Sequence, residues 1–202
     1  NLGGVGSPKV VGSAIGLDEA IRKGLVSSVG GFDAKAAEDA QKFAVENSRM
    51  KIPLITGLDV VHGYYTIFPI PLASACSWNM PLLEESARVA ADEASAFGIN
   101  WTFAPMVDIC RDPRWGRFAE GAGEAPCLGS RIGRAMVRGF QGDDLSKPNT
   151  LLACVKHFAL YGASEAGRDY NTVSMDPVTM YNYYLPPYKA AFDEGAGSGM
   201  TS

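Results

Sequence analysis

The sequence has few cysteines, no long apolar run and no excess of positive charge. Its four cysteines lie far apart without a Cys-x-x-Cys pair, which argues against a zinc site and against a dense disulfide framework. We expect most of them to be small buried residues. The most apolar segment, residues 64–76, is interrupted by Pro69 and Pro71, so no membrane span is predicted. Acidic residues outnumber basic ones by 22 to 18, which argues against nucleic acid as a partner.

Two further absences concern nucleotides and the ends of the chain. No Gly-x-Gly-x-x-Gly turn follows the first predicted strand, and no phosphate-binding loop with its lysine is present, which disfavours a nucleotide-binding sheet. The chain begins at Asn1 without a basic and apolar leader, and it stops at Ser202 without a cap or charged tail. We therefore expect a fragment of a longer polypeptide.

The sequence does contain an alternation of strand-like and helix-like segments, which predicts a parallel sheet covered by helices. Its hydrophobic content of 47% is enough for a sizeable core. Runs of β-branched and apolar residues predict strands at 25–29, 54–58, 99–107 and 151–155. Periodicity and capping residues predict helices at 34–49, 80–98, 128–140 and 177–195, the last kinked or broken at Pro186-Pro187.

The spacing of these units helps to choose between an open doubly wound sheet and an eight-stranded barrel. A barrel of about 250 residues uses roughly 31 residues for each strand and helix. Here the later predicted strands start about 45 to 52 residues apart, so each unit carries a long loop after its strand. Long loops of this kind are often functional. We therefore expect an α/β fold of the TIM-like (β/α)8 barrel type, incomplete in this chain.

Charged residues gather directly after the predicted strands, where the carboxyl ends of barrel strands carry the active site. Both histidines of the chain are among them. After the strands that end at residues 58, 107 and 155 come, in turn, Asp59 and His62; Asp108, Arg111, Asp112, Arg114 and Arg117; and Lys156 and His157. A purely structural protein has no need of such a rim, so the sequence predicts a functional site at this end of the sheet.

The segment 111–117, with the sequence RDPRWGR, allows two interpretations. It is either a surface loop with one ion pair or a buried hydrogen-bond network that fixes a polyhydroxylated ligand, with Trp115 as a wall or support. Pro113 and Gly116 in so short a span indicate a specified backbone path. We therefore favour the functional interpretation.

Lys156 and His157 also allow two interpretations, because each is either a satisfied core residue or a donor to a ligand. A buried lysine is costly without a partner, and this partner is expected to be Asp59, Asp108 or a ligand hydroxyl. Sugars need several directional hydrogen bonds at once. The set Asp59, Arg117, Lys156 and His157 offers them.

Other kinds of site find less support. A metal site of His62, His157 and Asp59 lacks a typical ligand spacing, and Lys156 would repel the cation. A Ser-His-Asp triad lacks the Gly-x-Ser-x-Gly elbow. Glycoside hydrolysis needs two carboxyl groups across a sugar-sized gap, but composition alone does not select the pair.

Four motifs in this order resemble the N-terminal catalytic barrel domain of glycoside hydrolase family 3. They are GLDVVHG at 57–63, TIFP at 66–69, APMVD at 104–108 running into RDPRWGR at 111–117, and KHF at 156–158. The stretches YGA at 161–163 and GRDYN at 167–171 are similar to the periplasmic bacterial β-glucosidases of that family. The resemblance covers about residues 25–202.

The resemblance implies a retaining, exo-acting enzyme that removes terminal β-D-glucosyl residues from a β-glucoside or oligosaccharide through a covalent glycosyl-enzyme. It implies no metal or organic cofactor, and a periplasmic or secreted location. By position, the residues that it implies for binding glucose hydroxyls are Asp59, Arg117, Lys156 and His157. The supporting residues around them would be His62, Asp108, Arg111, Asp112, Trp115, Arg168 and Asp169.

In the family, the nucleophilic aspartate lies on a later barrel strand and the general acid comes from a following α/β domain. The resemblance therefore implies that residues 1–202 are a partial barrel domain without a catalytic residue of its own. We expect this chain alone to be inactive, with the missing strands and the following domain as its partners.

One motif departs from the family pattern. Glu124-Ala125-Pro126-Cys127 stands where relatives have Gly-Glu, then Asp-Pro and an aromatic residue, so we expect a looser loop. Two alternative functions stay open: a β-xylosidase or broad exo-glycosidase, and a noncatalytic carbohydrate-binding barrel fragment. The N-acetylhexosaminidases are disfavoured, because their Pro-Gly-His-Gly pattern does not follow the KHF motif here.

Overall fold

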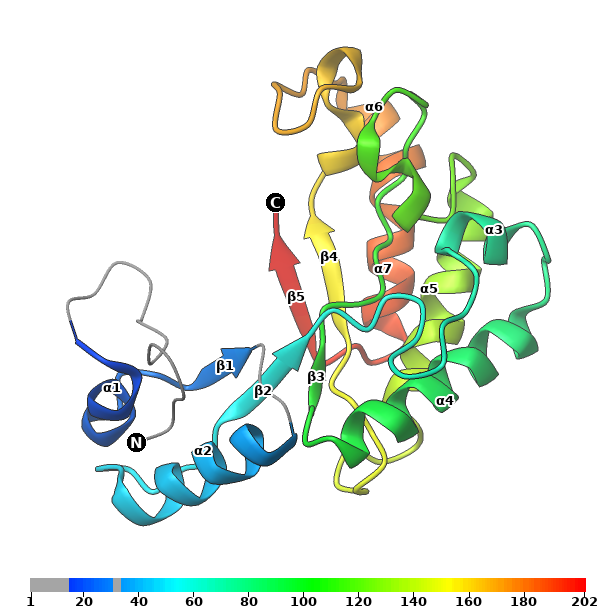
Figure 1. Ribbon diagram of the computed structural model, residues 1–202. Coiled ribbons are helices and arrows are strands. Elements are labelled where there is room, and N and C mark those ends of the chain that lie inside the picture. The colour runs from blue at the N-terminus through cyan, green and yellow to red at the C-terminus, as the bar shows by residue number, and fades with distance from the viewer. Residues whose placement is uncertain (1–14, 31–33) are drawn as a thin grey trace.

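The computed structural model describes residues 15–30 and 34–202, which form a row of parallel strands covered by helices (Figure 1). The strands are β1 (Ser28–Gly30), β2 (Ile55–Leu58), β3 (Trp101–Thr102), β4 (Cys154–Phe158) and β5 (Ser198–Thr201). β1, β2 and β3 form one parallel sheet, and β4 pairs with β5 in a second. Two isolated parallel bridges, Trp101–Leu152 and Met106–Lys156, connect the segments around β3 and β4.

Helices follow the strands in alternation. They are α1 (Leu17–Lys23), α2 (Ala34–Asn47), α3 (Pro71–Ala75), α4 (Met80–Ala96), α5 (Pro126–Gln141), α6 (Pro177–Thr179) and α7 (Pro186–Asp193). A π-helical segment, η4 (Met180–Tyr184), joins α6 to α7, and the loops after β3 and β4 carry the 3-10 turns η1 (Gly116–Glu120), η2 (Tyr161–Ala163) and η3 (Glu165–Gly167). In Figure 1, α4, α5 and α7 stand together on one side of the strands.

Small residues let α4 and α5 pack closely. α4 begins after Asn79, whose side chain accepts a hydrogen bond from the Leu82 N–H. Gly139 of α5 faces α4, and a Cβ at this position would lie 2.4 Å from the Glu84 carbonyl oxygen. Glycine is therefore needed where the two helices meet. The buried face of α4 is mostly alanine, at positions Ala87, Ala90, Ala91 and Ala94.

The predicted α/β architecture is confirmed, but the sheet is open, and the described strands do not close into a barrel. β3 is shorter than the strand predicted at 99–107, because Pro105 has no N–H to give to a ladder. Beyond Thr102 the chain keeps single backbone bonds to its neighbours, such as that from the Val107 N–H to the Lys156 carbonyl. The prediction of a continuous strand there is therefore wrong.

β4 differs from the strand predicted at 151–155, because it begins at Cys154 and extends to Phe158. Lys156 and His157 therefore lie within the strand rather than after it. The pairing of β4 with β5 shifts register between Lys156 and Phe158, which leaves a bulge at His157. Such bulges re-aim the side chains next to them.

The helical region after residue 176 is broken at Pro186, as predicted. Asp176 caps α6 by accepting a hydrogen bond from the Thr179 N–H, and Pro186 occupies the first turn of α7. The prediction missed three short elements, α1, α3 and β5, which have too few residues for a periodic pattern.

The cysteines divide into two groups. Cys110 and Cys154 are buried, and burial raises the pKa of the Cys110 thiol to about 11. Cys76 and Cys127 are exposed, so the expectation that most cysteines are buried is wrong for this pair. All four are free thiols.

Replacing Ala125 by aspartate is expected to stabilise the domain. Ala125 is the N-cap residue of α5, with extended backbone and no side-chain bond to the first turn. An Asp side chain there would accept a backbone N–H of that turn and interact favourably with the helix dipole, which together contribute about 1 kcal/mol. Urea unfolding should show the increase for Ala125→Asp and also for Ala125→Ser, which caps without charge. Equal stability of all three proteins would contradict this capping role.

Candidate functional site

The loops after β3 and β4 interlock at the carboxyl ends of the strands, at the top of Figure 1. A Cβ at Gly162 would lie 2.3 Å from the Ile109 carbonyl oxygen. Gly167 has a φ of +65°, and a Cβ there would lie 2.9 Å from the Trp115 amide nitrogen. Only glycine fits these two contacts, so the side chains on both loops are held close together.

Lys156 and Asp59 form an ion pair at this end of the sheet. The Lys156 Nζ lies 2.6 Å from Asp59 Oδ1, and the lysine side chain is 3% exposed whereas the aspartate is 61% exposed. Of the partners expected for Lys156, the structure therefore selects Asp59. An ammonium has three N–H donors and a carboxylate has two oxygens, so both groups keep hydrogen-bonding capacity for a ligand.

Asp108 fixes the position of His157 through two hydrogen bonds. Its buried carboxylate Oδ2 accepts hydrogen bonds from the backbone N–H and the Nδ1 of His157, both at 2.9 Å. Tyr188 of α7 donates its hydroxyl to Asp108 Oδ1, and the same hydroxyl lies 2.7 Å from the His157 carbonyl oxygen. Burial, together with the Asp108 charge, raises the pKa of Tyr188, so this phenol keeps its proton and remains a donor.

Arg117 is held between Glu120 and His157. Its Nε and Nη2 each donate to one Glu120 oxygen at 2.7 Å, and its Nη1 lies 3.2 Å from His157 Nε2. The Asp108 carboxylate at Nδ1 and the guanidinium at Nε2 assign the His157 hydrogen to Nδ1. Hydrogen bonds from Arg117 lower the pKa of Glu120, and the charges of Arg117 and Lys156 lower it further. The Lys156–Asp59 pair and the Arg117–Glu120 pair therefore belong to one cluster.

Aromatic side chains support this cluster. Trp115 is buried, and its Nε1 donates to Asp169 Oδ1 at 2.9 Å. The Tyr161 ring makes edge contacts with Trp115 and His157, and the Arg117 guanidinium lies over it, 5.4 Å from the ring centre. Burial raises the pKa of Asp169, but the Trp115 N–H, the nearby Tyr161 hydroxyl and Arg117 outweigh it, so that the pKa is lowered.

Part of the RDPRWGR segment lies apart from the cluster. Asp112 pairs with the exposed Arg114 at 2.6 Å, and hydrogen bonds from Arg114 lower the pKa of Asp112 to about 2. Arg111 is exposed and lies over an aromatic ring of η4. The prediction of a buried network is therefore wrong for Arg111, Asp112 and Arg114. These three side chains are directed to the surface, whereas Trp115 and Arg117 point inward.

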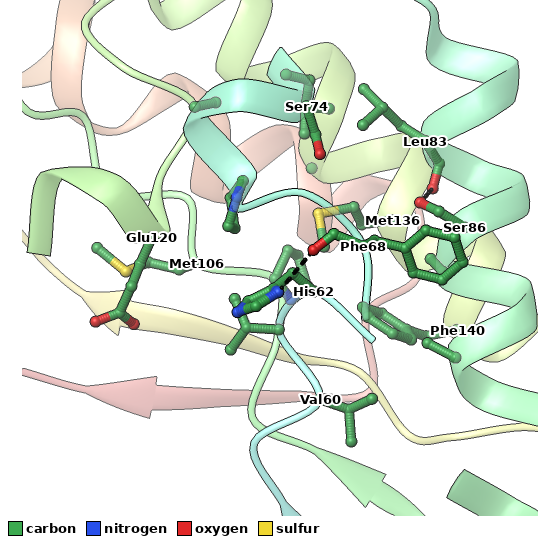
Figure 2. Close-up of a pocket in the computed structure, with 18 of the residues that line it drawn as sticks. Val60, His62, Phe68, Ser74, Leu83, Ser86, Met106, Glu120, Met136 and Phe140 are labelled. Carbon is green, nitrogen blue, oxygen red and sulfur yellow. Dashed lines mark hydrogen bonds between the residues drawn. The ribbon is translucent and has the colours of Figure 1, made fainter. Parts of the chain in front are cut away.

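His62 lies beside the cluster rather than in it. Its Nδ1 is 3.0 Å from the Phe68 carbonyl oxygen, and together with Glu120 it lines a cavity between the loop after β2 and helices α4 and α5 (Figure 2). This cavity measures about 40 Å³, and its walls include Leu83, Met136 and Phe140. It has room for a few water molecules but not for a sugar ring. Arg168, the remaining predicted supporting residue, is exposed.

Three residues of the cluster were not predicted: Glu120, Tyr161 and Tyr188. Glu120 lies three residues after Arg117 in η1, and this spacing could have suggested an ion pair. Tyr161 follows β4 within the motif YGA, where its aromatic character was the only signal. Tyr188 lies 80 residues from Asp108 in the sequence, and nothing in the sequence relates the two.

Metal ligands do not gather in the part of the chain that the structure describes, since no three His, Cys, Asp or Glu side chains come together there. Over residues 15–30 and 34–202, no helix has the length and apolar character to cross a membrane.

A parallel α/β fold with charged side chains at the carboxyl ends of its strands is the arrangement of α/β barrel enzymes. Residues 19–202 match the Glycosyl hydrolase family 3 N terminal domain, and the chain belongs to this family. It is a β-glucosidase-like domain, as the following relatives indicate.

Among curated proteins, the periplasmic β-glucosidase of Salmonella typhimurium is 44% identical over 92% of this chain, which covers 24% of that protein. A β-xylosidase of Formosa agariphila is 35% identical over 84% of the chain, which covers 25% of it. The chain therefore spans about a quarter of the length of these relatives.

Two solved structures illustrate the likeness of fold. A mutant β-glucosidase from Listeria innocua in complex with laminaribiose has 48% identity and a TM-score of 0.85 over 87% of this chain and 25% of its own. The same enzyme in complex with glucose has 47% identity and a TM-score of 0.83 over the same shares.

Proposed function

We propose that this chain provides the glucose-binding part of a retaining, exo-acting β-glucosidase. The observation that carries the proposal is the cluster of Lys156, Asp59 and Arg117, in which each charged group keeps unused hydrogen-bonding capacity. Within the described residues, Lys156 uses one donor, on Asp59, and Arg117 uses three of its five N–H groups. The remaining donors and the free Asp59 oxygen match the alternating donors and acceptors of a glucosyl ring.

His157 has a different part in this proposal, because both ring nitrogens already have protein partners. It completes the sugar site by holding Arg117 in place. A glucose hydroxyl that takes over Nε2 would do so as a donor, since the hydrogen of the ring is on Nδ1. Two further hydrogen bonds support the same geometry: Asp108 accepts from the His157 backbone N–H, and Trp115 donates to Asp169.

We further propose that residues 1–202 are part of a barrel domain whose nucleophile and general acid are supplied by further barrel strands and an α/β domain. The relatives are about four times as long as this chain, which supports this division of labour. A periplasmic location is proposed on the name of the Salmonella relative. The substrate is a β-glucoside or a short β-linked glucan, by analogy with the laminaribiose bound in the Listeria structure.

The test compares glucose binding by the unmodified chain and by Asp59→Ala, measured by calorimetry or by NMR titration. The variant is expected to lose about tenfold or more in affinity, because charge-assisted hydrogen bonds to the sugar contribute about 1.5–3 kcal/mol. The control is Asp143→Ala, since Asp143 is almost fully exposed and pairs with Lys147. Unchanged affinity in Asp59→Ala, or an equal loss in the control, would contradict the proposal. The chain alone is expected to release no nitrophenol from an aryl β-glucoside.

A β-xylosidase or a broad exo-glycosidase is the second candidate, and the observation that favours it is the β-xylosidase of Formosa agariphila. Xylose lacks the C6 hydroxymethyl group but shares the ring hydroxyls, so the same cluster would bind both sugars. Tighter binding of xylose than of glucose in the titration described above would favour this alternative.

A further inference from the structure

The segment between β2 and α4 presents an apolar surface to solvent. Five of its large side chains are between 45% and 80% exposed, namely Tyr65, Ile67, Ile70, Trp78 and Leu82. At roughly 200 Å² for a large side chain, these five expose about 600 Å² together. The largest apolar patch of a monomeric protein is usually about 300–600 Å², so this surface, called here the α3–α4 surface, is at the upper limit. Figure 1 shows α3 and the loop between α3 and α4 at the outer edge of the molecule, away from the strands.

The α3–α4 surface is continuous along one face of α4. At one end, the Glu93 carboxylate accepts hydrogen bonds from the backbone N–H groups of Tyr65 and Thr66, which ties the loop after β2 to the helix. Towards the start of α4, Val89 and Leu82 follow Glu93 at helical spacing. A hollow of about 380 Å³ lies along this face. The residues that line it include Phe68, Pro69, Leu82, Leu83 and Val89.

Trp78 lies next in sequence to Ser77, which lines the hollow. It also directly precedes Asn79, the N-cap of α4, and an apolar residue at that position often packs onto the fourth residue of the helix. Trp78 is not buried in this way, since 71% of it is exposed, and its backbone has a left-handed φ of 53°. This conformation is unfavourable for a bulky residue and is concentrated at functional sites. Tryptophan is also enriched among the residues that dominate the binding energy of protein interfaces.

The polar groups of the hollow are already used within the chain. Its hydroxyls each donate to a nearby backbone carbonyl, as Figure 2 shows for the last of the three: Ser74, Ser77 and Ser86. Among the described residues that line the hollow, Glu85 alone is charged. A sugar or another polar ligand needs several unused hydrogen-bonding groups to orient it. The hollow therefore favours an apolar side chain as its occupant.

We propose that the α3–α4 surface is the interface between two copies of this chain related by a two-fold axis. The same patch then serves on both sides, so it has to be complementary to itself. The α3–α4 surface has both parts that this requires, because the Trp78 ring of each copy enters the hollow of the other. The proposal goes beyond the proposed function and does not rest on it.

Charge and area support a second copy as the partner. A two-fold axis brings identical residues together, so a charge near the axis would meet the same charge. No Asp, Glu, Lys or Arg occurs from residue 60 to residue 83, although the chain as a whole has a net charge of −4. The exposed side chains supply about 600 Å², and the walls of the hollow add to it, against roughly 800 Å² per partner in a standard interface.

The test measures the oligomeric state of the chain by sedimentation velocity at micromolar concentrations. The unmodified chain is expected to be a dimer, and Trp78→Lys is expected to weaken its association by about 30-fold or more, because a tryptophan at the centre of an interface dominates the binding energy. Val178→Lys is the matched control, since Val178 of α6 is 69% exposed and lies outside the α3–α4 surface. It introduces the same charge and should leave the dimer intact.

A second variant, Leu82→Glu, separates association from folding. Leu82 is the third residue of α4, where a glutamate interacts favourably with the helix dipole, so urea unfolding of the monomer should show no loss of stability. Association is expected to weaken about tenfold or more, since an apolar wall of the hollow is replaced by a charge. A monomeric unmodified chain, or a dimer that persists in both variants, would overturn the proposal. Protection of Trp78 from acrylamide quenching in a monomeric, longer form of the polypeptide would assign the surface to a contact within one chain and overturn it too.

Discussion

Lys156→Met is expected to lower glucose affinity by about 10- to 150-fold without lowering the free energy of unfolding. The loss of affinity reflects charge-assisted hydrogen bonds, each of which contributes about 1.5–3 kcal/mol. Stability is spared because Lys156 is a buried cation whose partner is well exposed. Water can solvate Asp59 once the lysine is gone, and replacing a buried charge by an apolar side chain of similar length is often neutral or stabilising.

Calorimetric titration with glucose and urea unfolding of the same protein samples measure the two effects. Lys189→Met is the matched control, since Lys189 lies on the exposed face of α7 and pairs with Asp193. It should change neither quantity appreciably. A Lys156→Met protein that binds glucose normally, or that is strongly destabilised, would mean that the lysine has a structural role instead.

Asp108→Ala is expected to destabilise the domain by about 3–5 kcal/mol, the largest loss among the substitutions considered. The Asp108 side chain is fully buried and accepts hydrogen bonds from two groups of His157 and from Tyr188. Its removal leaves two buried donors of His157 without a partner, and each such donor costs about 1–3 kcal/mol, while the Tyr188 hydroxyl keeps the His157 carbonyl as its acceptor. The variant also loses the contact that keeps the His157 hydrogen on Nδ1.

Urea denaturation measures this loss, and Asp108→Asn refines it, because asparagine keeps one acceptor oxygen and is expected to lose less. Asp193→Ala provides an exposed comparison on α7, where the carboxylate pairs with Lys189. A loss below about 1 kcal/mol in Asp108→Ala would show that His157 and Tyr188 find other partners, against the arrangement described above.

The order of the elements could be predicted from the sequence because it depends on local patterns. The Asn79 cap, the alanine stripe of α4 and the break at Pro186 are signals that the chain carries within a few residues. The position of the charged rim followed in the same way, since it needs only the ends of the strands. Closure into a barrel was a different kind of prediction, because it depends on strand pairings between distant segments.

Within the site, the sequence could not separate residues of the same type in the same motif. Arg111, Arg114 and Arg117 are the same residue type in one motif, yet of these three only Arg117 points inward. It lies in η1, where it pairs with Glu120 three residues later. Tyr188 contacts Asp108 from α7, which is far along the sequence from the loop that carries Asp108. Such contacts arise from tertiary packing, and one sequence on its own has no local pattern that records them.

Consecutive residues of a regular strand point to opposite faces, yet Lys156 and His157 serve the same cluster. The irregular pairing of β4 with β5 at His157 makes this possible. A substitution in β4 therefore alters one contact, whereas inserting or deleting a single codon there would turn one of the two side chains away from the sugar. New sugar preferences in this domain are thus expected to evolve by amino-acid exchange and by changes in loop length, while the length of β4 itself stays constant.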